Sequence, residues 1–312
     1  ERKYVIINFL IIIQGTTMLD PKRTVRIGAA STYVTEIKKI MQESAPDAEF
    51  LFRGQSSVDY QLLPSLGRNS NFLKHERDLI ALAKYKKPDV FTNTMLPLET
   101  LALLQHYGVP TRLLDVTESA LVALYFACQP TRNSTNKDGV VYVFCDKSKR
   151  VSNHAILNAV ADSAYILNFN DLHTVRLEDF FDAMLKQSYW KSTSAAQGDH
   201  KNSKPDYVDK HLRGPLFVNA PAFTLRQQIQ QGRYILFPNK ITHNARNEKC
   251  FSDTLAPIDE NDESVAGKII ISNQQKKAVL KELKTLGITE YSLFSDSIDI
   301  VCKGIKDQFA ND

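Results

Sequence analysis

Cysteine is scarce in this chain. The 312 residues include only Cys128, Cys145, Cys250 and Cys302, and their spacing matches neither a metal site nor a disulfide framework. The seven histidines form no pair at the spacing of a helical metal site. We therefore expect no metal site, and unpaired cysteines favour the reducing cytoplasm as the location of the protein.

Strong net charge and long apolar runs are also missing. The net charge of +4 is too small to require a nucleic-acid partner, and 43% hydrophobic with 24% charged residues is typical of a soluble globular protein. One apolar stretch, residues 4–13, is too short to span a bilayer and precedes Met18. We expect residues 1–17 to be a non-native or upstream-translated leader, and we expect no membrane partner.

A Gly-x-Gly-x-x-Gly loop and a strict βαβ rhythm are absent, which argues against a Rossmann sheet. Helical periodicity predicts helices at residues 32–44, 73–86, 98–106, 119–128, 179–185 and 273–286. Short runs rich in β-branched and aromatic residues predict strands at 50–52, 140–144, 234–238 and 268–271, with 140–144 buried on both faces. The polar, basic segment 193–210 is predicted to be a loop. The pattern indicates an α+β protein with a mixed or split sheet among helices.

We divide the remaining chain, residues 18–312, into three parts of one domain. A helical N-terminal part covers about 18–49, a core covers about 50–250, and a strand–helix extension covers about 251–312. A chain of this length can bury a large core, so one elaborated domain is compatible with its size.

The segment 104–117 places turn-forming and polar residues between two helical patterns. Gly108 and Pro110 mark a loop. Four polar residues then stand among apolar neighbours: Thr111, Arg112, Asp115 and Thr117. Polar groups at a core boundary need partners, so we expect Arg112 and Asp115 to form a buried ion pair. The alternative is that these groups face a ligand.

Two further segments carry candidate site residues. The predicted strand at 50–52 runs into Arg53 and Gly54, where a guanidinium suits a phosphate or carboxylate and a glycine permits close approach of a ligand or of another backbone. Four glutamines between residues 227 and 231 precede the strand at 234–238. They either cap a helix and satisfy loop backbone or belong to a site.

Together these motifs resemble the bacterial FRG-domain family. The resemblance is carried by Phe52-Arg53-Gly54, Leu62-Leu63-Pro64-Ser65-Leu66, His106-x-Gly108-x-Pro110-Thr111-Arg112-Leu113-Leu114-Asp115-x-Thr117 and Arg226-x-x-x-Gln230-x-Gly232-x-Tyr234. It covers roughly residues 30–300. Val116 replaces the tryptophan usual in the central motif, and Glu118-Ser119 replaces the usual Asn-Pro, which alters the wall of the expected pocket.

The resemblance implies an ADP-ribosyltransferase-like fold with NAD as co-substrate. It implies catalytic roles for Arg53, Thr117 and Gln230, and it implies NAD contacts from Arg53, Gly54, Gln55, His106, Thr111, Arg112, Asp115 and Thr117. The acceptor of ADP-ribose would be RNA, DNA or protein. The implied setting is a toxin or antiviral defence effector restrained by a neutralising antitoxin.

A second reading stays open because a glutamine amide cannot take a proton as a general base. In this reading the same cleft belongs to a non-catalytic module that binds a nucleotide or nucleic acid.

Overall fold

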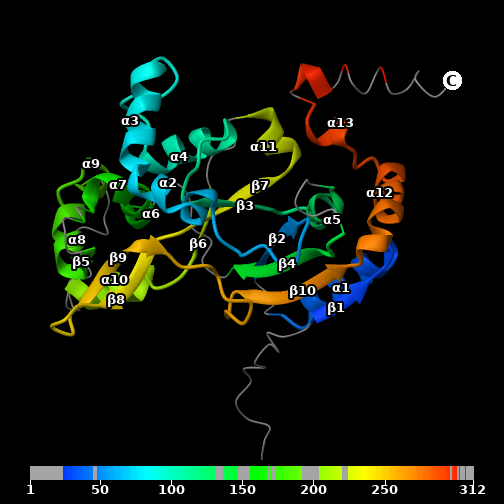
Figure 1. Cartoon of the computed structure of the whole chain (residues 1–312), viewed down its shortest axis with the longest axis horizontal. Coiled ribbons are helices and arrows are strands. Elements are labelled where there is room, and N and C mark those ends of the chain that lie inside the picture. Colours follow the sequence, from blue (N-terminus) through cyan, green and yellow to red (C-terminus); the bar gives the residue numbers. More distant parts are fainter. Residues whose placement is uncertain are drawn as a thin grey trace, which may run out of the picture.

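The computed structural model describes residues 24–44, 48–130, 136–146, 155–167, 169, 173–191, 204–219, 224–295, 297–300, 302 and 306, and arranges them around two sheets (Figure 1). The leader expected at 1–17 lies outside the described residues. Among the described residues, no helix has the length and apolar character needed to cross a membrane.

The strands are β1 (Thr24–Ile27), β2 (Glu49–Gln55), β3 (Leu113–Thr117), β4 (Gly139–Asp146), β5 (Thr174–Arg176), β6 (Leu216–Val218), β7 (Gly232–Leu236), β8 (Asn239–His243), β9 (Lys249–Leu255) and β10 (Val265–Ile271). The larger sheet has seven strands in the order β1-β10-β4-β2-β3-β7-β6, and the smaller has the order β5-β9-β8. Strands β1 and β10 pair in parallel, whereas the other pairs are antiparallel. The predicted α+β class with a mixed sheet is confirmed.

The helices are α1 (Ala30–Gln42), α2 (Ser70–Lys74), α3 (Glu76–Lys86), α4 (Pro97–His106), α5 (Ala120–Cys128), α6 (Ala155–Ala161), α7 (Ser163–Ile166), α8 (Leu177–Met184), α9 (Ser188–Lys191), α10 (Lys204–Leu212), α11 (Leu225–Ile229), α12 (Lys276–Thr285) and α13 (Glu290–Leu293). The structure also describes two short 3₁₀ helices, η1 (Ser65–Arg68) and η3 (Asn273–Gln275). Helices α1, α5 and α12 lie beside the larger sheet, and α8 and α10 lie beside the smaller one (Figure 1).

Strand β4 is buried on both faces, as its composition predicts. Val141 and Val143 pack with α1, α5 and α12, whereas Tyr142 and Phe144 pack in a second cluster on the opposite face. Successive side chains of a strand point to opposite faces, so one apolar run contributes to both clusters. A third cluster joins α4, α6, α8 and α10 to β6 and β7.

Several boundaries differ from the predictions. The helix expected at 73–86 is two helices, α2 and α3, because His75 leaves the helical conformation between them. The prediction of a loop at 193–210 is wrong for residues 204–210, because Lys204 begins α10, whose Val208 and Leu212 are buried. Residues 193–203 lie outside the described residues. In α1, Tyr33 faces the core, whereas Val34 and Met41 are exposed. Strands β1, β3, β5, β6, β8 and β9 were not predicted.

The point at which β2 meets β3 decides where the site lies. These strands share one paired position, Phe52 with Thr117, whereas β2 pairs along its whole length with β4, and β3 pairs along its length with β7. The sheet therefore has few backbone pairs at its middle, between β2 and β3, and continuous pairing on either side. Beyond the single pair, side chains rather than backbone connect β2 to β3.

Candidate functional site

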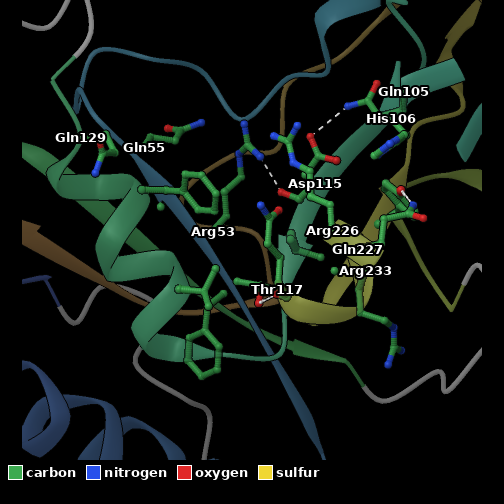
Figure 2. A pocket seen from close by; sticks show the side chains of 18 of the residues that line it. Arg53, Gln55, Gln105, His106, Asp115, Thr117, Gln129, Arg226, Gln227 and Arg233 are labelled. Atoms are coloured by element: carbon green, nitrogen blue, oxygen red, sulfur yellow. Dashed lines mark hydrogen bonds between the residues drawn. The ribbon is translucent and has the colours of Figure 1, made fainter. Parts of the chain in front are cut away.

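One cavity of about 420 Å³ opens where β2 and β3 cease to pair (Figure 2). Its lining comes from β2, β3 and β7, from α5 and α11, and from the ends of α4 and η1. Seven of the predicted site residues line it: Arg53, Gly54, Gln55, His106, Asp115, Thr117 and Gln230. Thr111 and Arg112 are buried outside the lining.

Arg53 connects β2 to β3 across this opening. It lies within β2, which extends beyond the strand predicted at 50–52, and its Nη1 donates to the carbonyl oxygen of Asp115 on β3 (Figure 2). Burial lowers the pKa of Arg53 to about 10, against the opposing effect of Asp115, so the guanidinium stays charged at neutral pH. Its Nε is buried and has no hydrogen-bond partner among the described residues. The arginine therefore keeps donors for a ligand.

Three more arginines line the cavity. Arg68 donates through Nε to the carbonyl of Leu63, 2.9 Å away, and burial lowers the pKa of Arg68. Arg226 stacks over the ring of Phe294 at 4.3 Å. Arg233 pairs with Glu118 and Glu49 and extends away from Arg53 (Figure 2).

A single carboxylate, that of Asp115, faces these arginines among the described lining residues. The cavity therefore carries excess positive charge, which attracts an anion.

The predicted ion pair between Arg112 and Asp115 is wrong. Arg112 is 1% exposed and makes a two-point contact with the carboxylate of Glu76 on α3, with 2.8 Å between Arg112 Nε and Glu76 Oε1. It also donates to Asn239 Oδ1 and to the carbonyl of Phe237. Residues 112 and 115 are three apart on an extended chain, so their side chains point to opposite faces. Arg112 is part of the core, and Asp115 is exposed to the cavity.

A short chain of side-chain hydrogen bonds orients Asp115. The hydroxyl of Thr111 donates to Gln105 Oε1 at 2.8 Å, and Gln105 Nε2 donates to Asp115 Oδ2 at 2.9 Å (Figure 2). The second carboxylate oxygen, Oδ1, accepts no hydrogen bond from the residues that the structure describes. Thr111 thus reaches the site through Gln105, and Asp115 presents one open oxygen.

Gly54 permits close packing of β2 against α5. A Cβ at this position would lie 1.8 Å from the carbonyl oxygen of Ala123. We considered that this glycine permits close approach of either a ligand or another backbone. The structure shows the second, with the backbone of α5 against Gly54.

Thr117 and Gln230 meet at the base of the cavity. The Thr117 hydroxyl donates to the backbone oxygen of Gln230 at 2.6 Å and accepts from the backbone N–H of Ser119 at 3.0 Å. Gln230 Nε2 donates to the carbonyl of Leu293 at 3.0 Å, whereas its Oε1 accepts nothing from the described part of the chain. Thr117 therefore holds the loop, and Gln230 presents a fixed acceptor.

Gln227, another glutamine of this segment, serves both uses that we left open, because it caps a helix and lines the cavity. Gln227 forms a capping box with Thr224 at the start of α11 and donates to the hydroxyl of Tyr234. His106 Nδ1 lies 3.3 Å from the Thr224 hydroxyl. Burial and the charge of Asp115 raise the pKa of Tyr234, so its hydroxyl keeps its proton.

Arg68, Arg226, Gln105 and Gln129 also line the cavity, and we did not predict them as site residues. Arg226 stands at the head of the motif that ends in Tyr234, so its place in that motif was an available signal. Arg68 and Gln129 have no comparable signal, because they come to the cavity through η1 and the end of α5.

A family comparison agrees with the motifs at the cavity. No curated protein and no solved structure matches the chain. The model of the FRG domain matches residues 48–136, a range that contains β2, α4, β3 and α5 and therefore most of the cavity wall. Residues 48–136 of this chain are an FRG domain.

Proposed function

We propose that the protein is an NAD-dependent ADP-ribosyltransferase that modifies a macromolecular acceptor. In the proposed reaction the bond between nicotinamide and C1′ of the ribose breaks, and its electron pair leaves with nicotinamide. An acceptor nucleophile forms the new bond to C1′ and releases a proton. The transition state has oxocarbenium character, so it gains from negative charge and from oriented acceptors near the ribose.

The observation that carries the proposal is that Arg53, Arg68 and Arg226 line the same cavity as Asp115, whose carboxylate is the only one among the described lining residues. The remaining N–H groups of Arg53 suit a pyrophosphate. A cavity of about 420 Å³ is within the size range of small-molecule sites in proteins. The cavity therefore offers cations for the diphosphate and a carboxylate for the ribose.

Two acceptor oxygens are available for the ribose, the open Oδ1 of Asp115 and Oε1 of Gln230. Each side chain is held by one hydrogen bond through its other polar atom, so its orientation is fixed before a ligand binds. Fixed groups aimed at developing charge account for a large share of enzymatic rate acceleration. In this proposal Asp115 stabilises the cationic ribose and Gln230 orients a ribose hydroxyl.

The test is incubation of the purified chain with NAD labelled in its adenylate phosphate, together with RNA, single-stranded DNA or cell protein. Release of nicotinamide with transfer of label to one of these fractions supports the proposal. We expect Asp115→Asn and Gln230→Ala each to lower turnover by about 10²-fold or more, with little change in NAD affinity. Gln230→Glu should retain or raise turnover, because a carboxylate still accepts from the hydroxyl.

Arg53→Ala should lower NAD affinity at least about tenfold, as expected for loss of a charge-assisted pair of hydrogen bonds. Arg233→Ala is the matched control, because both terminal nitrogens of Arg233 are already paired, with Glu118 and Glu49. Equal effects of the two substitutions would contradict the phosphate role of Arg53.

The second candidate function is a binding module without turnover. Its supporting observation is that one of the residues implied as catalytic, Gln230, is a glutamine whose amide nitrogen already donates to the carbonyl of Leu293. NAD binding without nicotinamide release in any fraction would make this the function of the cleft.

A further inference from the structure

Gln55 has an unusual position for a glutamine. Its side chain is 4% exposed and lines the cavity. Its Nε2 donates to the backbone oxygen of Gln61 at 3.3 Å, which fixes the amide orientation. Its Oε1 is buried without a hydrogen-bond partner among the described residues. A buried acceptor left unpaired is unfavourable, so this oxygen is complementary to a donor that enters the cavity.

The surroundings of Gln55 suit a planar base. Phe126 and Val122 of α5 line the cavity together with Gln55 and Gln129. In Figure 2, Gln55 and Gln129 lie on one side of Arg53, whereas Gln105 and His106 lie on the other side, beyond Asp115. Gly54, next to Gln55 on β2, packs against Ala123 and Ala127 of α5, the helix that carries Val122 and Phe126. These apolar side chains are therefore near the amides of Gln55 and Gln129, and the carboxylate of Asp115 belongs to the other end.

We propose that Gln55 is a specificity-determining residue whose Oε1 accepts a hydrogen bond from the exocyclic N–H group of a nucleotide base. This inference rests on the proposed function in that NAD supplies two such groups, the carboxamide of nicotinamide and the 6-amino group of adenine. Both place an N–H donor at the edge of a flat ring. In this arrangement Phe126 and Val122 cover the ring. Gln55 distinguishes a ring edge that carries an N–H donor from a ring edge that carries an oxygen acceptor.

The experiment measures the affinity of the full chain for NAD and for two analogues by calorimetry. Nicotinic acid adenine dinucleotide has a carboxylate oxygen in place of the carboxamide nitrogen. Nicotinamide hypoxanthine dinucleotide has a carbonyl oxygen in place of the adenine amino group. We expect one of the two to bind about tenfold or more weakly than NAD, because an oxygen would face the buried Oε1 of Gln55. The analogue that loses affinity identifies the base at this end.

The variant Gln55→Met removes the acceptor and keeps the length of the side chain, so it should bind NAD and that analogue within about twofold of each other. Gln55→Leu also removes the acceptor and should also lose the preference, which gives a second variant if the first does not fold. Gln228→Met is the matched control, because Gln228 is exposed and outside the lining. It should keep the wild-type preference.

Equal affinity of the wild-type protein for NAD and both analogues overturns the inference, as does a preference that survives in Gln55→Met. Failure of the proposed function has a different signature. If no dinucleotide binds, the NAD proposal fails. A comparison of the affinities for AMP and IMP, measured in the same way, then tests the role of Gln55. AMP binding about tenfold or more tightly than IMP, with the difference lost in Gln55→Met, supports the role of Gln55; any other result with this pair overturns it.

Discussion

Among single residues, Arg112 and Asp115 have opposite environments although three positions separate them. Arg112 is buried against Glu76, Phe237 and Asn239, which lie on α3 and beyond β7. Asp115 faces the cavity and contacts Gln105. One side chain therefore stabilises the fold, and the other is available for chemistry.

This division predicts different effects of substitution on stability. Arg112→Ala and Glu76→Ala should each lower the free energy of unfolding by about 3 to 5 kcal/mol, because each leaves a buried charge without its partner. Asp115→Asn should change it by less than about 1 kcal/mol, because the side chain is exposed. Urea unfolding followed by circular dichroism measures all three. A loss for Asp115→Asn as large as that for Arg112→Ala would show that Asp115 is structural.

At the scale of elements, the local sequence pattern was sufficient to predict a helix where that helix carries its own capping residues and periodicity. The helix predicted at 273–286 ends as expected, with Gly287 at a φ of 80° and with hydrogen bonds from Gly287 and Ile288 back to Lys284 and Leu283. Ser119 caps α5 at its predicted start. The short α11 was missed, because a five-residue helix has too little periodicity to detect.

The contact between β2 and α5 yields a prediction about Gly54. Gly54→Ala should lower the free energy of unfolding by about 3 kcal/mol or more, because its Cβ would overlap backbone atoms of α5 that cannot rotate away. Gly214→Ala is the control, since a Cβ there would meet no atom within 4 Å. It should change stability by less than about 0.5 kcal/mol. Similar melting temperatures for the two variants would argue against this close packing.

A second prediction at this scale concerns Asp162, which follows α6 and accepts a hydrogen bond from Tyr189 on α9. Burial raises the pKa of Asp162 to about 6, against the lowering effects of Tyr189 and Lys84. The folded protein therefore binds this proton more tightly than the unfolded chain. The resulting stability is complete below about pH 4, near the ordinary carboxyl pKa, and is lost as pH rises through about 6.

Asp162→Asn cannot ionise, so at pH 7 it should be more stable than the wild-type protein by about 1 to 3 kcal/mol, or a few degrees in melting temperature. The difference should shrink as pH falls from 6 to 4. Thermal unfolding of both proteins across this range measures it. A difference independent of pH would mean that Asp162 titrates normally.

At the scale of the whole molecule, the sequence indicated the class of fold and seven of the residues that line the cavity, but not how they meet. The cavity depends on two strands, β2 and β3, that pair at only one position. Strand pairing between distant segments is set by tertiary packing, which periodicity does not report. The same limit explains the error over Arg112, whose partner Glu76 lies 36 residues away on another element.

The last prediction concerns the FRG segment expressed alone. Strand β2 takes its long partner, β4, from residues 139–146, and β3 takes its long partner, β7, from residues 232–236, both outside 48–136. A fragment of residues 48–136 would therefore expose both strand edges and should not give a cooperative unfolding transition, whereas the full chain should. Calorimetry of the two proteins compares them, and a sharp transition for the fragment would contradict this dependence on distant strands.

The long partners of β2 and β3 have a consequence for how such a protein can change in evolution. Residues 226–234 bring Arg226, Gln230 and Tyr234 to a cavity whose other walls lie within the FRG segment, and α13 holds Gln230 through Leu293. A recombination event that moved only residues 48–136 into another gene would transfer part of a site and none of its support. We expect the two segments to be inherited together, so that ligand preference changes by substitution within the intact chain and not by exchange of the FRG segment as a cassette.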